Sequence, residues 1–143
     1  MKNRYLEMKR KHQEQINNFP LKFAFSKDQV EEGMKELGVT KKEVVSIGAG
    51  GFLRKTDFSR FKKESRERIE EMEKAIADDK TGEGFIYEMF YYELNNHEYC
   101  VTYSIADTVE GLGMTEEEVY NSESLLNGIN KAKKQIQKEM EMM

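Results

Sequence analysis

Residues 57–78 read DFSRFKKESRERIEEMEKAIAD, and this stretch carries the clearest structural signal in the chain. One residue in every three or four lies on a single stripe, which consists of Phe58, Phe61, Ser65, Ile69, Met72 and Ile76. This spacing is typical of one face of an α-helix. Thr56 or Asp57 can cap its first turn, and Gly82 follows its end. We therefore expect a helix over 57–78.

Similar spacing predicts helices over 3–18 and 122–141. Between them, Ser26 and Gln29 form a capping box, which predicts a helix that ends at Gly38 in the left-handed cap position. Residues 84–96 are ambiguous, because helical spacing coincides with a density of aromatic residues typical of strands. We favour a helix there. Short strands are expected at 22–25, 52–55 and 99–103.

The expected fold class is therefore α+β and mostly helical, with about four main helices and two or three short strands. The chain has 143 residues, which favours one domain over residues 1–143. Within it, residues 1–19 form an N-terminal helix that packs peripherally. The single cysteine, Cys100, excludes an internal disulfide, and we expect it to be half buried.

The net charge of -4 hides a strong asymmetry along the chain. Residues 54–68 carry seven basic and three acidic side chains, whereas residues 69–99 carry two basic and nine acidic ones. Such polarity is most often a solvated helix face, but it also suits a surface for an acidic partner or nucleic acid. The sequence has no apolar run of membrane-spanning length and no secretory signal, so we expect a cytoplasmic protein without membrane contact.

Residues 46–56, SIGAGGFLRKT, resemble a phosphate-binding loop at first sight. A P-loop that used Lys55 and Thr56 would need glycine at Ala49 and Arg54, and a dinucleotide-binding pattern would need glycine at Leu53. The sequence therefore disfavours nucleotide binding by either motif and predicts no cofactor. We interpret the glycines as a turn that delivers Arg54 and Lys55 to a contact surface.

The turn from Leu37 to Thr40 suggests a different class of protein. Together with Val44 it matches the pattern of helix-turn-helix units, and the pattern recurs at 109–119. However, Met34 stands where such units need a small residue, and the second copy carries three consecutive glutamates, which DNA phosphates would repel. A DNA-binding regulator that uses the basic 54–68 segment is thus the alternative function.

Catalytic and metal-binding patterns are sparse. The sequence contains two histidines without zinc-site spacing, so we predict neither a metal nor catalytic residues. The polar cluster to watch is Asn96, His97 and Glu98, which we interpret as a helix C-terminus with an asparagine in the left-handed cap. A small enzyme that uses His97 with Glu93 or Glu98 is the second alternative. Adjacent Tyr91 and Tyr92 cannot both point inward, so one of them should lie at a surface or interface.

Several segments resemble, in the same order, a family of uncharacterised small proteins of phages and other mobile elements of Gram-positive gut bacteria. The resemblance spans residues 20–130 and rests on Phe23–Ser26, Glu32–Met34, Ile47–Lys55, Asn96–Tyr99 and the later Leu-Gly-Met-Thr turn. The resemblance implies that the protein is encoded by a phage or other mobile element. It implies no activity, cofactor or catalytic residue.

Together these features predict a non-enzymatic accessory protein that binds another macromolecule, and in a phage-like setting the target is a host protein or defence complex. A protein partner is expected, with nucleic acid and a homo-oligomer as open alternatives. The predicted contact residues are Arg54, Lys55, Arg60, Lys63, Arg66, Tyr91 and Tyr92.

Overall fold

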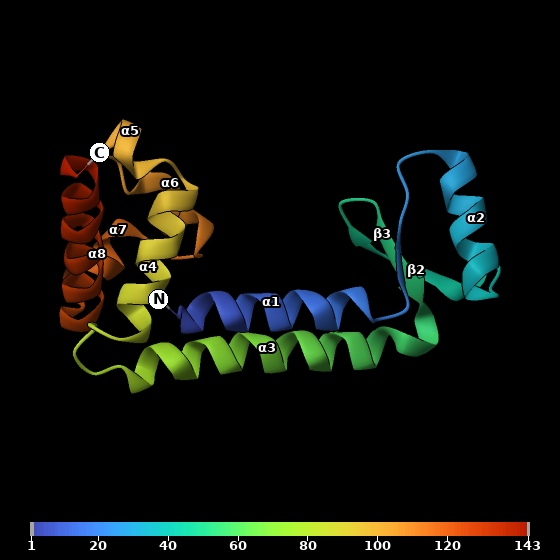
Figure 1. Ribbon diagram of the computed structural model, residues 1–143. Helices are drawn as coiled ribbons and strands as arrows, with labels where there is room; N and C mark the ends of the chain where they lie inside the picture. Colours follow the sequence, from blue (N-terminus) through green and yellow to red (C-terminus); the bar gives the residue numbers. More distant parts are fainter. Residues whose placement is uncertain (1, 143) are drawn as a thin grey trace. The chain divides into compact units, whose positions relative to one another are not determined.

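The computed structural model describes residues 2–142, which form eight α-helices, two 3-10 turns and one three-stranded sheet (Figure 1). The mostly helical α+β class is confirmed, but the expected number of about four main helices was too low because several helices are very short. The helices are α1 (Arg4–Asn17), α2 (Lys27–Leu37), α3 (Phe58–Asp78), α4 (Phe85–Asn96), α5 (Tyr99–Thr102), α6 (Ala106–Gly111), α7 (Glu116–Asn121) and α8 (Glu123–Glu141). The strands are β1 (Leu21–Phe23), β2 (Val44–Gly48) and β3 (Gly51–Arg54), and the 3-10 turns are η1 (Lys41–Glu43) and η2 (Lys55–Asp57).

The described chain divides into two compact units. Unit 2 is the continuous segment Arg10–Glu71, and unit 1 comprises residues 2–9 and 72–142. The boundaries fall inside α1 and α3, so each of these helices contributes residues to both units. Unit 2 holds the sheet, and the regular elements among the described residues of unit 1 are all helices.

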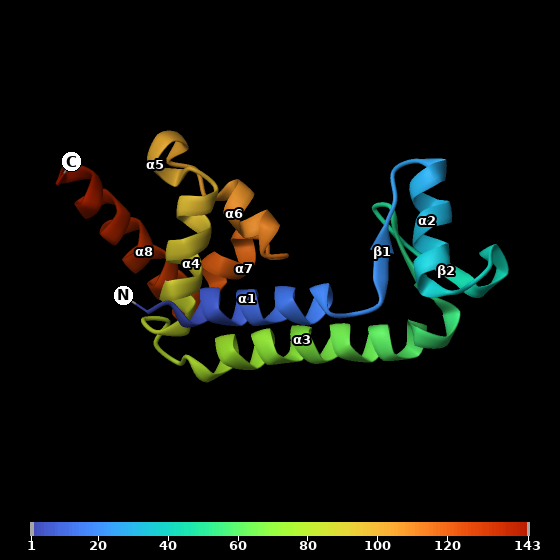
Figure 2. The same ribbon diagram turned by 45° about the vertical axis from the view of Figure 1, so that its right-hand side comes forward.

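The core of unit 1 is centred on α4 and α8, which lie side by side (Figures 1 and 2). The ambiguous stretch at 84–96 is a helix, as favoured, and its side chains Ile86, Phe90 and Leu94 are fully buried. These residues are four apart, so their side chains lie on the same face of the helix. The N-terminus of α1 completes this unit, because Arg4 forms an ion pair with buried Glu88 over a 2.6 Å Nη2–Oε2 distance.

The strand expected at 99–103 is a single helical turn, α5, so that prediction was wrong. Left-handed residues, Glu98 and Tyr103, bound the turn on each side. A strand needs a neighbouring strand for its backbone hydrogen bonds, and the described residues of unit 1 include none. The turn instead buries Tyr99 and leaves Cys100 exposed, contrary to its expected half-buried position.

Unit 2 contains an antiparallel sheet with the strand order β1-β3-β2. The strands expected at 22–25 and 52–55 are present with shifted bounds, whereas β2 was not predicted. Helix α2 is capped at its N-terminus by Ser26, whose side chain accepts a hydrogen bond from the Gln29 amide, and at its C-terminus by left-handed Gly38, as the sequence predicts. It lies beside the sheet (Figure 2). Gly33 lets the helix approach the Phe52 ring closely, because a Cβ atom at this position would overlap the ring.

In unit 2, Phe19, which follows the end of α1, packs against Phe61 of α3 with ring centroids 5.5 Å apart, and His12 Nε2 of α1 lies 2.8 Å from Glu71 Oε1 of α3. The predicted stripe on α3 is only partly covered, since no residue of this helix is fully buried and Ile69 is 58% exposed. Two helices that pack only against each other leave part of each apolar face exposed, because no third element covers it. Among residues 2–142 no helix combines the length and apolar character needed to cross a bilayer.

Candidate functional site

The glycines of the SIGAGGFLRKT stretch form the tight turn between β2 and β3. Gly48, Ala49 and Gly50 all have positive φ angles, of 91°, 51° and 80°. Such a run of left-handed residues reverses the chain within a hairpin and is accessible mainly to glycine. The stretch is thus a hairpin, and its basic residues follow at the far end of β3.

Three of the predicted basic residues are paired with nearby carboxylates. Arg54 Nε lies 2.7 Å from Asp57 Oδ2, Arg60 Nε lies 3.2 Å from Glu64 Oε2, and Lys63 Nζ lies 3.9 Å from Glu67 Oε1. The Arg60 guanidinium also lies over the Phe19 ring at 4.4 Å from its centroid. These contacts screen the positive charge locally, so the segment is less basic than its composition suggests.

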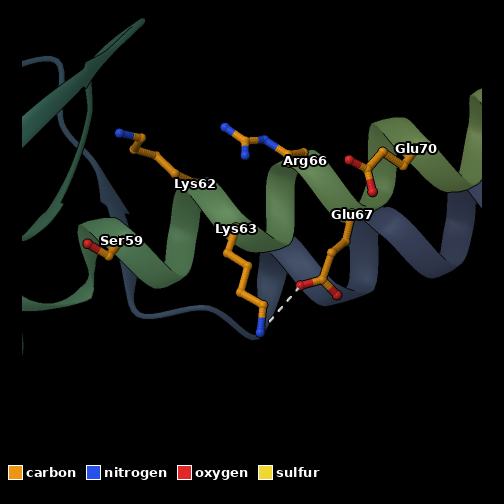
Figure 3. Close-up of a pocket in the computed structure, with 6 residues that line it drawn as sticks. All are labelled: Ser59, Lys62, Lys63, Arg66, Glu67 and Glu70. Carbon is orange, nitrogen blue, oxygen red and sulfur yellow. Dashed lines mark ion pairs between the residues drawn. The ribbon is translucent and has the colours of Figure 1, made fainter.

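Lys62 and Arg66 form the least neutralised part of the basic segment. Both are exposed, and within residues 2–142 neither forms an ion pair. One turn apart on α3, they line an open concavity of about 480 Å³ together with Ser59 and Glu70 (Figure 3). Lys55, in η2, is also exposed. Arg66 and Lys55 are therefore the predicted basic residues whose charge stays available.

Both predicted tyrosines take part in packing within unit 1. The Tyr91 hydroxyl donates to the Glu139 carboxylate, 2.6 Å from Oε1, and this hydrogen bond with partial burial raises the pKa of Tyr91 to about 12. Tyr92 packs against the Tyr5 ring and carries the Lys9 ammonium 5.3 Å from its centroid. The two side chains are half buried, so the tyrosine pair is part of the helix packing as well as of the surface.

The polar cluster at the end of α4 does not assemble a catalytic arrangement among the described residues. His97 is the C-cap of α4, but Glu98 takes the left-handed backbone that was expected of an asparagine. The Glu93 carboxylate is buried and held by Lys9 at 3.2 Å, and no hydrogen bond joins it to His97 in the described chain. Over the same residues, no three potential ligands of the His, Cys, Asp or Glu type gather where they could hold a metal ion.

An apolar groove lies in unit 2, and sequence reasoning missed it. A groove of about 420 Å³ runs between α2 and the sheet, and its apolar lining includes Val30, Met34, Val44 and Phe52. It forms only when α2 is laid on the sheet, so no local pattern marks it. The sequence signal that was available concerns the exposed phenylalanines instead: residues 23–25 read Phe-Ala-Phe, and the structure buries Ala24 and leaves Phe23 and Phe25 exposed.

Phe23 and Phe25 are 55% and 81% exposed, and their rings lie against the hairpin turn. A Cβ atom at Gly50 would come within 2.8 Å of the Phe25 ring, and one at Gly51 within 3.1 Å of the Phe23 ring. Gly50 and Gly51 also line the groove. Phe23 is next to Lys22, whose register partner Phe52 lines the groove, so the Phe23 side chain points to the opposite face of the sheet. The two phenylalanines thus form an exposed apolar surface at the hairpin turn that is separate from the groove.

A family model matches residues 4–135, and the chain belongs to this family, which is described as a family of unknown function (DUF7659). The matched region includes all of unit 2 and most of unit 1. No curated protein and no solved structure matches the chain.

Proposed function

We propose that this chain is a non-enzymatic, cytoplasmic accessory protein that binds another protein through unit 2. The observation that carries the proposal is the exposure of Phe23 and Phe25 at the hairpin turn of unit 2, a unit that also contains an apolar groove. Large apolar side chains gathered at a surface are characteristic of protein interaction sites. On the resemblance noted from the sequence, the setting is a phage or other mobile element, and the partner is then a host protein or defence complex.

A substitution of the exposed phenylalanines should abolish partner binding without loss of fold. We expect the double variant Phe23→Ser/Phe25→Ser to retain the melting temperature of the wild type to within a few degrees, because both side chains are mostly in solvent. In pull-downs from a native host lysate, the wild type should retain one stoichiometric partner and this variant should lose it. Circular dichroism and quantitative mass spectrometry provide the two readouts.

Unit 1 offers a matched control for this experiment. Val101 and Tyr103 have the same spacing as the two phenylalanines and are 72% and 60% exposed. The variant Val101→Ser/Tyr103→Ser should keep the partner, since it removes a comparable apolar area from a different surface. Retention of the partner by the phenylalanine variant, or its loss from the control alone, would contradict the proposal.

The Lys62 and Arg66 pair favours nucleic acid as the second candidate partner. If the basic face of α3 binds duplex DNA, affinity should fall steeply with salt, because each neutralised phosphate releases counterions. Lys62→Glu/Arg66→Glu should then abolish binding in fluorescence anisotropy, whereas Lys131→Glu/Lys134→Glu on α8 should have little effect. Weak binding that is indifferent to both substitutions would exclude this face as a nucleic-acid site.

A further inference from the structure

The outer strands of the sheet in unit 2 differ sharply in how well they are protected. β1 has three residues, follows Pro20 and carries Lys22, which forms an ion pair with Glu36 of α2. Short length, proline and lysine are the features by which natural sheet edges avoid pairing with other chains. β2 has five residues, contains neither proline nor charge, and is hydrogen-bonded to β3 alone. β2 therefore presents an open edge.

The open edge adjoins the apolar groove. Val44 and Ser46 of β2 contribute one wall, and Val30 and Met34 of α2 contribute the other. An added strand would have half of its side chains on this face of the sheet, because side chains alternate along a strand. One of them would reach the groove, whose volume of about 420 Å³ is within the range of ligand-binding pockets.

The charges that line the groove indicate what kind of segment would bind. Lys27 on α2 and Lys41 in η1 stand on opposite walls, and within the described residues neither forms an ion pair. Glu31 is the acidic residue of the lining. Unit 2 as a whole carries 14 basic and 11 acidic side chains. The surface is thus complementary to a segment with carboxylates beside its apolar residue.

We propose that the partner supplies an extended segment that pairs with β2 as a fourth strand, places one apolar side chain in the groove and sets acidic residues against Lys27 and Lys41. This inference rests on the proposed protein-binding function and specifies its mode. Main-chain hydrogen bonds to the edge would provide affinity, and the groove with its two lysines would provide specificity.

A random nine-residue peptide library, displayed and selected against the immobilised full chain, provides the probe. We expect the selected peptides to share an apolar residue with aspartate or glutamate nearby. In a synthetic copy of the best peptide, N-methylation at successive positions should abolish binding at every second residue, because alternate amides of an edge-paired strand face the partner strand. The change is confined to the peptide, so it leaves the fold of the protein intact.

The role of the two lysines is tested by charge reversal. Lys27→Glu/Lys41→Glu should weaken peptide binding by at least about tenfold, since two attractive contacts become repulsive. Lys35→Glu/Lys42→Glu is the matched control, because it makes the same change of net charge on the same two elements at residues outside the groove. We expect the control to bind within about twofold of the wild type at 150 mM salt, where distant charges are screened.

The results that would overturn the inference are distinct from those that bear on the proposed function. Selection of no peptide or of basic peptides, or an N-methylation scan without alternation, would exclude strand addition by an acidic segment. Sedimentation showing a dimer that dissociates on Lys27→Glu/Lys41→Glu would identify a second copy of the chain as the occupant instead. In each case, a partner captured through Phe23 and Phe25 would leave the protein-binding function standing.

Discussion

An alanine at Gly82 is expected to lower the free energy of unfolding by about 3 kcal/mol, which combines backbone strain with steric overlap. Gly82 has a φ angle of 85°, and its Cβ would overlap the backbone carbonyl oxygen of Ser124 near the start of α8. Because that obstacle is main chain, it cannot move aside as a flexible side chain would. Urea denaturation followed by circular dichroism measures the loss.

A substitution at Gly113 separates the cost of backbone strain from the cost of steric overlap. Its φ angle of 74° is similar, but no atom lies within 4 Å of the position that a Cβ would take. Gly113→Ala should therefore cost about 1 kcal/mol, the backbone part alone. Equal losses in the two variants would show that the loop at Gly82 is not held closely against α8.

Replacing Asp79 by alanine should cost about 2 kcal/mol, because its ionised carboxylate satisfies several main-chain donors at once. The amides of Gly82, Gly84 and Ile86 donate to it at 3.0, 3.1 and 3.0 Å. Asp79 thereby joins the end of α3 to the beginning of α4. Its neighbour Asp78 is exposed and pairs only with Lys74 in the described chain, so Asp78→Ala should change stability by less than about 0.5 kcal/mol.

The Asp79 variant should also change how stability depends on pH. Burial by itself would raise the pKa of Asp79, but the three amide hydrogen bonds outweigh it and hold the pKa below the ordinary value of 3.8. A pKa that is lower in the folded state means that the stabilisation is complete above about pH 4 and is lost as pH falls through the folded value. As pH falls below about 4, wild type should therefore lose stability more steeply than Asp79→Ala.

Glu88, paired with Arg4, contributes in the same direction, so part of the acid sensitivity should remain in the Asp79 variant. Urea denaturation at several pH values measures both slopes. Parallel slopes for wild type and variant would contradict the role assigned to the Asp79 carboxylate.

The parts of the fold that could be predicted were those whose signals are local. Ser26 and Gly38 bracket α2 through caps that need only neighbouring residues, and the long helices follow from the spacing of their own side chains. β2 escaped prediction because a strand exists only through its partner, and Val44 also fitted a helix-turn-helix pattern. There the chain turns once in η1 and then continues extended, so no recognition helix forms at this position.

In the candidate site, too, features with a local signal could be predicted from the sequence and features that depend on tertiary packing could not. The pairing of Arg60 with Glu64 and of Lys63 with Glu67 was available from sequence, since residues four apart face each other on a helix. Reading the segment by composition alone overstated its free charge. The groove could not be foreseen, because its walls come from α2 and the sheet, and their distance depends on how the whole unit packs.

Unit 2 is one uninterrupted segment whose two ends meet, since His12 Nε2 on α1 lies 2.8 Å from Glu71 Oε1 on α3. A segment with adjoining ends can be exchanged by a single recombination event without opening the chain elsewhere. Unit 1, by contrast, needs residues from both sides of that segment to close its core, as Tyr5 and Arg4 show. Unit 2 therefore has the form of an insertion, and its replacement as a whole would leave in place the residues on both sides of it that build the core of unit 1.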